Sequence, residues 1–226
     1  MIEESKIEAQ NPPLHKADVM RSAVFNEDCM LTMKRYPKNF FHLAIVDPPY
    51  GIGASEMQMG KGKNKRWDKG KQWDNETPTE EYWNELRRVS KNQIVWGGNY
   101  FDLPKTGGWV YWNKMRGKEV SFSDGELAWT NFLTTIKQID CRYDGFIGAD
   151  EIRIHPTQKP VKLYALLLKK FASEGDLILD THCGSGSLRI ACHKAGLGYV
   201  GSEIDTDYFE AQEARWKNFI SQTTLF

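Results

Sequence analysis

Apolar runs of strand length alternate with amphipathic helical patterns along most of this chain. Residues 41–47 and 177–180 are almost continuously apolar, whereas the apolar side chains of residues 79–89 repeat on one helical face. Continuous apolar strands between helices are typical of a parallel sheet that is covered on both faces. The alternation therefore predicts an α/β fold with a mostly parallel sheet, flanking helices and right-handed crossovers.

The same pattern places the individual elements. Strands are expected at residues 24–29, 41–47, 93–96, 109–112, 126–129 with a continuation at 133–136, 177–180 and 199–204, and helices at 30–36, 79–89, 160–171 and 188–194. Thr79 is expected to cap the helix that follows it. Gly175 and Gly196 are expected to close the last two helices, because glycine is common just beyond a helix end.

Length and hydropathy indicate one globular domain. The 226 residues suit a single α/β domain at 21–226, preceded by a flexible lead-in at 1–20 with a proline pair and no clear period. No apolar run approaches the roughly 20 residues of a membrane helix, and the N-terminal ten residues are too polar for a signal peptide. A cytoplasmic protein that does not cross a membrane is expected.

Charge and cysteine spacing narrow the function further. Thirty basic and 30 acidic residues give a formal net charge of zero, which argues against global electrostatic capture of nucleic acid but leaves local patches open. The four cysteines form no CxxC pair and show no metal-ligand spacing with the five histidines. Neither a metal site nor a disulfide framework is predicted, and free thiols are expected.

The strongest candidate for chemistry is Asp47-Pro48-Pro49-Tyr50, at the end of an apolar run. An aspartate at the carboxyl end of a buried strand, two prolines that stiffen the turn and an aromatic ring together suit the binding of a planar amine. The alternative is an ordinary strand end followed by a proline turn. These four residues are taken as candidate catalytic residues.

A second candidate is a glycine turn between two strands of the last third. A strand at 177–180, the turn at 183–187, a helix and a strand with Glu203 near its end follow in that order. Glycines allow a close backbone approach, a helix start offers free amides, and an acid can bind ribose hydroxyls. A dinucleotide-binding enzyme is the competing interpretation, but the spacing is GxG followed by serine and not GxGxxG.

Four motifs together resemble those of the amino DNA methyltransferases of the β class. They are DPPY at 47–50, HPTQKP at 155–160, DTHCGSGS at 180–187 with Glu203 after it, and NEDCM at 26–30. The resemblance covers about residues 24–217 and implies a Rossmann-like S-adenosylmethionine-dependent methyltransferase fold with permuted motif order. It also implies methyl transfer to an exocyclic amine of adenine or cytosine in DNA.

The resemblance assigns a set of residues to S-adenosylmethionine. They are Asp28, Cys29, His155, Thr157, Lys159, Asp180, His182, Gly184, Gly186, Ser187 and Glu203. Asp28 would bind the adenosyl amine, Glu203 the ribose, and Lys159 the methionine carboxylate. Asp28 could equally cap the following helical turn, and Lys159 could be a surface lysine before a helix. The family usually has Pro and Phe where this chain has Thr181 and His182.

The long polar segment at 51–78 combines basic residues, glycines and tryptophans. Its candidate DNA-binding residues are Lys61, Lys63, Lys65, Arg66, Lys69 and Lys71. A charge run is usually a solvated loop, but beside the catalytic turn this one could follow phosphates and stack on bases. Little chain remains for a separate recognition domain, so base choice is expected to come from loops, from a dimer partner, or to be loose.

The function expected from these features is a DNA adenine methyltransferase of a bacterial or phage-infected cell. Asp47 and the Pro48 carbonyl would accept hydrogen bonds from the amine, and Tyr50 would stack on the flipped-out base. A cytosine 4-amino methyltransferase, an RNA adenine methyltransferase and a catalytically silent nucleic-acid-binding relative remain alternatives. Attack at carbon five of cytosine would need a nucleophilic cysteine, usually after proline, and no cysteine here follows one. The resemblance also raises a homodimer and a separate restriction endonuclease as partners.

Overall fold

An eight-stranded sheet forms the centre of the computed structural model, which describes residues 22–53, 74–116, 123–142 and 152–223. The sheet has the order β1-β8-β7-β2-β3-β5-β4-β6. Its strands are β1 (Ala23–Phe25), β2 (Phe41–Val46), β3 (Ser90–Trp96), β4 (Trp109–Asn113), β5 (Gly125–Thr130), β6 (Lys137–Asp140), β7 (Leu177–Asp180) and β8 (Gly198–Ser202). The helices are α3 (Cys29–Lys34), α4 (Glu80–Val89), the 3-10 turn η1 (Gly98–Tyr100), α5 (Val161–Phe171), α6 (Ser187–Lys194) and α7 (Thr206–Thr223).

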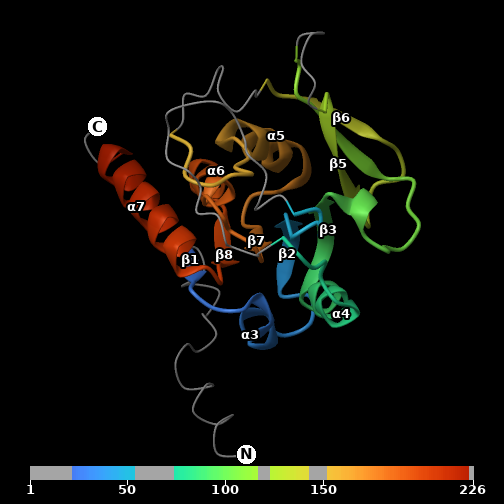
Figure 1. The fold of residues 1–226 in the computed structure, drawn as a ribbon, viewed down its shortest axis with the longest axis horizontal. Coiled ribbons are helices and arrows are strands. Elements are labelled where there is room, and N and C mark those ends of the chain that lie inside the picture. The colour runs from blue at the N-terminus through green and yellow to red at the C-terminus, as the bar shows by residue number, and fades with distance from the viewer. Residues whose placement is uncertain (1–21, 54–73, 117–122, 143–151, 224–226) are drawn as a thin grey trace, which may run out of the picture.

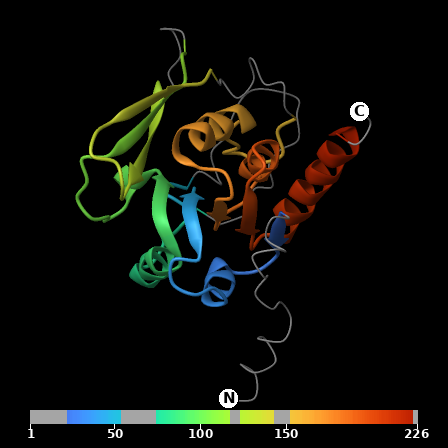
Figure 2. The same ribbon diagram turned by 180° about the vertical axis from the view of Figure 1, so that it is seen from behind.

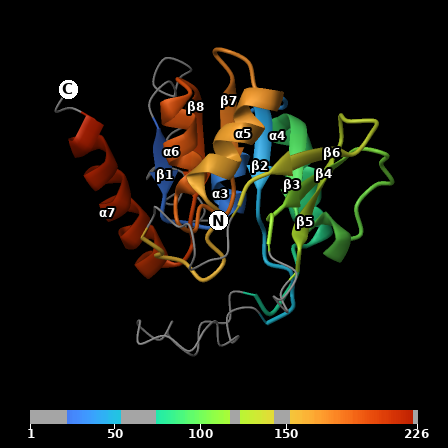
Figure 3. The same cartoon turned by 90° about the horizontal axis from the view of Figure 1, so that it is seen from above.

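Most of the sheet is parallel, as the alternation of strands and helices predicts. β1, β8, β7, β2 and β3 pair in parallel, β5 is antiparallel to both β3 and β4, and β6 is parallel to β4. Figure 3 shows β1, β8, β7, β2 and β3 side by side in this order, with α7 beyond β1. The α/β class with helices on both faces is therefore confirmed.

The two faces of the sheet bury separate hydrophobic clusters. Leu43 and Ile45 pack with α5 and α6 on one face, whereas Ala44 and Val46 pack with α3 and α4 on the other. Figure 1 shows these two helix pairs on opposite sides of the strands. Strand β2 is apolar throughout because successive side chains point to opposite faces and both faces are covered.

Several sequence-based boundaries differ from the structure: β3 begins at Ser90 and not at 93, and β8 spans Gly198–Ser202 and not 199–204. The continuation of β5 was expected at 133–136, but the strand lies at Lys137–Asp140, where Ile139 is buried and Ile136 is 65% exposed. Residues 131–136 instead form the connection that crosses the start of β4, because β5 and β6 lie on either side of that strand. The first strand ends at Phe25, and α3 begins at Cys29 because Asp28 caps it.

The last helix, α7, was not predicted from the sequence. Figures 1 and 2 show it at the opposite end of the sheet from β6. Only part of one face is apolar: Trp216 and Phe219 contact His193 of α6, and the Arg189 guanidinium lies 4.2 Å from the Trp216 ring centroid. So sparse an apolar face gives a weak helical signal.

The expected lead-in at 1–20 lies outside the described residues. Within the described ranges, none of the helices has the length and apolar content that crossing a membrane would require.

Candidate functional site

The candidate residues gather at the carboxyl edge of the parallel strands. Because β1, β2, β7 and β8 run in the same direction, the residues that follow them lie at one edge of the sheet. These residues are Asp28, Asp47 and Glu203, together with Asp180, which is the last residue of β7. Ligands of open α/β sheets bind at this edge. The topology thus brings both predicted motifs, the Asp47 turn and the glycine turn, to the same place.

The turn after β2 is held by an aspartate from a distant part of the chain. The Tyr50 hydroxyl donates to Asp47 Oδ1 at 2.6 Å. The backbone N–H groups of Tyr50 and Gly51 donate to Asp74 Oδ1 at 2.6 and 3.2 Å. Asp74 is only 2% exposed. Sequence reasoning missed Asp74, because nothing in the polar segment distinguishes it from neighbouring acids.

The Lys159 side chain forms an ion pair with the catalytic candidate Asp47. Its Nζ is 2.5 Å from Asp47 Oδ2, 3.2 Å from Glu126 Oε2 and 3.5 Å from the Tyr50 hydroxyl. Lys114 pairs with the other oxygen of Glu126 at 2.6 Å. Glu126 reaches this edge because β5 is antiparallel and begins where its parallel neighbours end. The structure therefore assembles a partly buried cluster of two carboxylates and two lysines, with Lys159 at its buried centre.

Electrostatics favour the charged forms of Lys159 and Glu126 in this cluster. Burial disfavours the charge of Lys159, but Asp47 and Glu126 outweigh that effect and raise the pKa of Lys159. Burial likewise opposes the charge of Glu126, and Lys159 and Lys114 reverse it, so the pKa of Glu126 is lowered. The Tyr50 pKa is raised by burial and by the negative charges of Asp47 and Glu126, so its hydroxyl keeps its proton.

The glycine turn and Glu203 form a second cluster. Glu203 Oε2 accepts from the Gly184 N–H at 2.9 Å and Oε1 accepts from the Asp205 N–H at 3.0 Å. A carboxylate oxygen can accept more than one hydrogen bond, so these contacts are compatible with an additional hydroxyl donor. Gly184 and Gly186 have φ of 49° and 68°, the left-handed region that glycine adopts without strain. This backbone can therefore approach a ligand closely.

His155 and Thr157 flank the same turn. A Cβ added to Gly184 would lie 3.5 Å from the His155 ring, whose other neighbour is Tyr208 at a centroid distance of 4.3 Å. The Thr157 N–H donates to His155 Nδ1 at 3.3 Å. Both residues are thus brought to the glycine turn, whereas Lys159 of the same motif is directed to Asp47.

Asp28 caps helix α3, which is the alternative role that its position allows. Its Oδ1 accepts from the Met30 N–H at 2.8 Å, and its carboxylate also has a hydrogen bond with the Cys29 side chain. Burial and the nearby Asp28 charge raise the pKa of Cys29 to about 12. That thiol is therefore protonated near neutral pH and is not a nucleophile.

Asp180 and His182 have strongly shifted pKa values. Burial raises the pKa of Asp180 to about 7, against the hydrogen bonds it accepts from the His182 N–H at 3.2 Å and the Tyr199 hydroxyl at 3.0 Å. Burial lowers the pKa of His182 to about 4. The His182 ring also lies beside Thr181, whose Oγ1 is 2.9 Å from Nδ1.

These two shifts predict opposite pH dependences of stability. Between pH 4 and 7 the folded state holds a proton on Asp180 that the unfolded state releases, so this group lowers the unfolding free energy by about 1.4 kcal/mol per pH unit as pH rises. Between pH 4 and 6.5 the unfolded state holds a proton on His182 that the folded state lacks, so this group has the opposite effect. The two slopes nearly cancel in the native protein.

Denaturant unfolding at a series of pH values tests this balance. Asp180→Asn is expected to leave an unfolding free energy that rises from pH 4 to 6.5, and His182→Gln one that falls from pH 4 to 7. His193→Gln, whose histidine lies on α6, serves as the matched control. Parallel pH profiles for the Asp180 and His182 variants would contradict the assigned shifts.

The six candidate DNA-binding residues, Lys61, Lys63, Lys65, Arg66, Lys69 and Lys71, lie outside the described residues. The described residues on either side of their segment meet: the Gly53 N–H donates to the Asp74 carbonyl oxygen at 3.2 Å. Since Asp74 also accepts from the Tyr50 N–H, the described residues on both sides of the segment lie beside the Asp47 turn.

The described part of the chain holds no group of three or more His, Cys, Asp or Glu side chains arranged for a metal ion. Cys29, Cys141, Cys183 and Cys192 are free thiols. Burial raises the pKa of Cys183 and Cys192 well above the ordinary thiol value.

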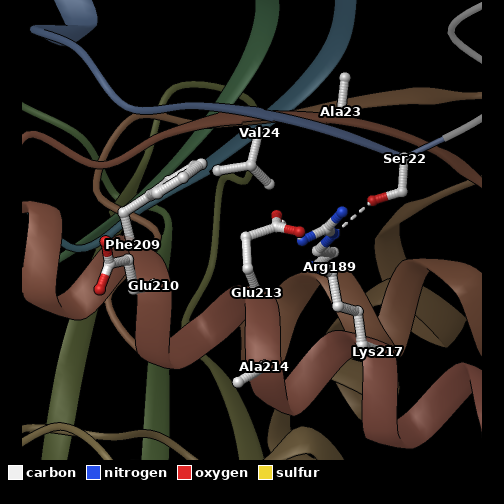
Figure 4. Close-up of a pocket in the computed structure, with 9 residues that line it drawn as sticks. All are labelled: Ser22, Ala23, Val24, Arg189, Phe209, Glu210, Glu213, Ala214 and Lys217. Carbon is white, nitrogen blue, oxygen red and sulfur yellow. Dashed lines mark hydrogen bonds and ion pairs between the residues drawn. The ribbon is translucent and has the colours of Figure 1, made fainter.

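A separate cavity of about 670 Å³ lies between β1, α6 and α7, and none of the predicted site residues lines it. Figure 4 shows Arg189 between Ser22 and Glu213 in this cavity. Arg189 donates to Ser22 Oγ at 2.7 Å and to Gln212 Oε1 at 3.1 Å, and it forms an ion pair with Glu213. Its charge is thus already compensated within the protein.

Comparison with known proteins identifies similar chains. The family model for N6 and N4 methyltransferases, described as DNA methylase, matches residues 109–214. The matched segment includes 155–160 and the glycine turn, and the Asp47 turn precedes it. A protein of Escherichia coli (strain K12) described as "Putative methylase YubD" is 26% identical over 212 residues, which cover 83% of this chain and 87% of that protein.

Solved structures share the fold. The PvuII DNA methyltransferase (cytosine-N4-specific) aligns with a TM-score of 0.56 and 13% identity over 85% of each chain. The M1.HpyAVI–SAM complex aligns with a TM-score of 0.53 and 15% identity over 87% of this chain and all of that one. The fold is therefore the Rossmann-like fold of S-adenosylmethionine-dependent methyltransferases.

Proposed function

We propose that this chain, which is similar to DNA methylases over residues 109–214 and to a methylase of Escherichia coli over most of its length, is an amino DNA methyltransferase that methylates the 6-amino group of adenine in DNA. The observation that carries the proposal is the position of Asp47 and the glycine turn at one edge of the sheet. Asp47 supplies a hydrogen-bond acceptor for an amine, and the glycine turn suits the binding of a nucleoside. An amino methyltransferase needs both parts side by side.

Asp47 and the Pro48 carbonyl accept hydrogen bonds from the target amine in this proposal. The amine lone pair is delocalised into the base, so the nitrogen attacks poorly until its geometry shifts toward tetrahedral. Both acceptors bind more strongly as positive charge develops on nitrogen, which stabilises the transition state more than the ground state. The transfer is direct and in line, without a covalent enzyme intermediate.

The glycine turn and its neighbours fit S-adenosylmethionine, the methyl donor of this family. When bound, this cofactor supplies an electrophilic methyl group on a sulfonium. Glu203, which already contacts the glycine turn, would bind the ribose hydroxyls, and the Asp28 carboxylate would accept from the adenosyl amine. Asp180 and the amides of the turn hold the methionine end in this scheme, with His155, Thr157 and His182 as walls of the pocket.

Lys159 has a different proposed role from the one that the motif implied. Its Nζ is already surrounded by Asp47, Glu126 and the Tyr50 hydroxyl, so its donors are directed away from a cofactor carboxylate. We assign it as a positioning residue that fixes the Asp47 carboxylate. Glu126 binds Lys159 and so contributes to fixing Asp47 indirectly.

DNA is the proposed substrate, held by the basic side chains of residues 61–71. The target base must leave the duplex stack to reach Asp47, at a cost of a few kcal/mol that contacts with this segment and the pocket offset. Residues 21–226 would act as a single methyltransferase domain with this segment, 51–78, as its DNA-contacting loop. A homodimer, a cognate endonuclease and a cytoplasmic location stay predictions.

Adenine is favoured over cytosine because this chain has aspartate, and not serine, before its two prolines. Nucleoside mass spectrometry of unmethylated DNA, incubated with the protein and S-adenosylmethionine, tests this choice. We expect 6-methyladenine. Formation of 4-methylcytosine would overturn the base assignment and leave the family reaction intact, and methylation of RNA alone would overturn the DNA substrate.

A further inference from the structure

Tyr50 is fixed beside Asp47 from several directions. Its hydroxyl donates to Asp47 Oδ1 at 2.6 Å, and its N–H donates to Asp74 Oδ1 at 2.6 Å. Gly97, with a φ of 65°, lies against the ring: an added Cβ would come 2.3 Å from Tyr50 Cε1. The ring therefore has little freedom to move, and Gly97 occupies one of its sides.

Tyr100 is stacked on this fixed ring. The two ring centroids are 5.0 Å apart and the ring planes differ by 14°. Unlike Tyr50, Tyr100 is 49% exposed. It ends the short turn η1 that follows Gly97, where its N–H donates to the Gly97 carbonyl at 2.8 Å. A half-exposed tyrosine at the end of a single turn can move far more easily than Tyr50.

The stack limits where a target base can lie. The base amine must come within hydrogen-bond distance, about 3 Å, of Asp47. A base in contact with the Tyr50 ring satisfies this condition, because the Tyr50 hydroxyl itself binds Asp47. A base on the outer face of Tyr100 would be separated from Tyr50 by a whole intervening ring. The productive position is therefore the one next to Tyr50, which Tyr100 now covers.

We propose that Tyr100 is the second wall of an aromatic clamp, closed on Tyr50 in the free protein and opened by the target base. This inference rests on the proposed function and adds a base-positioning residue to it. Stacked aromatic rings lie roughly 3.5 Å apart, so a base between Tyr50 and Tyr100 needs two such spacings. The distance between the two ring centroids must therefore increase from 5.0 Å to roughly 7 Å to admit a base. A small displacement of Tyr100 suffices. The closed stack also shields the Tyr50 ring when no base is present.

The clamp is tested with a set of variants that separates the ring from its bulk. Tyr100→Phe keeps the ring, Tyr100→Leu keeps an apolar side chain without one, and Ile136→Ala removes an exposed apolar side chain at the opposite edge of the sheet. The substrate is an unmethylated duplex that contains the site modified by the native protein. It carries either the normal base or 2-aminopurine at the target position. Cofactor binding and thermal unfolding confirm that each variant is folded.

Tyr100→Leu is expected to lower kcat/KM for DNA roughly 5- to 150-fold, the effect of losing one base-stacking ring. Tyr100→Phe and Ile136→Ala should stay near the native value, and 2-aminopurine fluorescence in the complex should increase for Tyr100→Leu because a quenching ring is lost. A Tyr100→Leu protein that matches Tyr100→Phe in both measurements would overturn the clamp. If the native protein methylates no DNA at all, the proposed function fails first, and the clamp falls with it.

Discussion

Asp47→Asn is expected to lower the methyl-transfer rate by roughly 10²- to 10³-fold while S-adenosylmethionine binding stays close to that of the native protein. The amide keeps the size of the side chain but loses the negative charge that stabilises a developing positive charge on the target nitrogen. Because Asp47 stabilises the transition state more than the bound base, the loss should appear in kcat more than in KM. Single-turnover kinetics and calorimetric titration of the cofactor measure the two quantities.

Asp140→Asn is the matched control, because Asp140 is an exposed carboxylate at the end of β6. Its transfer rate should equal that of the native protein. A native rate in Asp47→Asn would remove Asp47 from the chemistry. A loss of cofactor binding that parallels the loss of rate would instead assign Asp47 to the cofactor pocket.

Lys159→Met is expected to lower the unfolding free energy by about 3 kcal/mol, toward the lower end of the range for breaking a buried ion pair. The Lys159 side chain is 5% exposed and separates two carboxylates, of Asp47 and Glu126, that are 19% and 29% exposed. Without the ammonium these carboxylates repel each other, although Lys114 still compensates Glu126. Transfer should also slow, because the Asp47 carboxylate loses the partner that fixes its position.

Urea unfolding of Lys159→Met, of Glu126→Gln and of the double variant tests the cluster. The double variant should be less destabilised than the sum of the single variants, because the second change removes a carboxylate that the first left uncompensated. Lys162→Met, at an exposed position of α5, should stay near native stability. Additive effects would show that the three residues do not act as a unit.

The parts of the fold that are coded locally could be predicted from the sequence. β2 and β7 have continuous apolar runs because helices cover both faces of the sheet, and the structure has them at Phe41–Val46 and Leu177–Asp180. The expected Thr79 cap of α4 is present, with the hydroxyl accepting from the Tyr82 N–H at 3.4 Å. The signals for these features lie in neighbouring residues of the sequence, so no contact with a distant residue is needed to recognise them.

Only part of the candidate site could be predicted from the sequence. Asp47 and the glycine turn carry short motifs, but Glu126 reaches Lys159 beside Asp47 through the antiparallel placement of β5, and Asp74 reaches Tyr50 from near the end of the long polar segment. Neither pairing leaves a local pattern. Tyr100 was missed for the same reason, because it meets Tyr50 only through the pairing of β2 with β3. Sequence motifs thus indicated the chemistry, and the sheet order supplied the residues that position it.

In the proposed function the Asp47 turn and the glycine turn form one methyl-transfer site. Single-turnover incubation with S-adenosylmethionine labelled on its methyl group and unmethylated duplex DNA tests it most directly. We expect the label to move to an exocyclic base nitrogen with the native protein and the transfer to slow strongly in Asp47→Asn, although both proteins bind the cofactor. Cofactor binding by the native protein without any transfer of label to nucleic acid would contradict it.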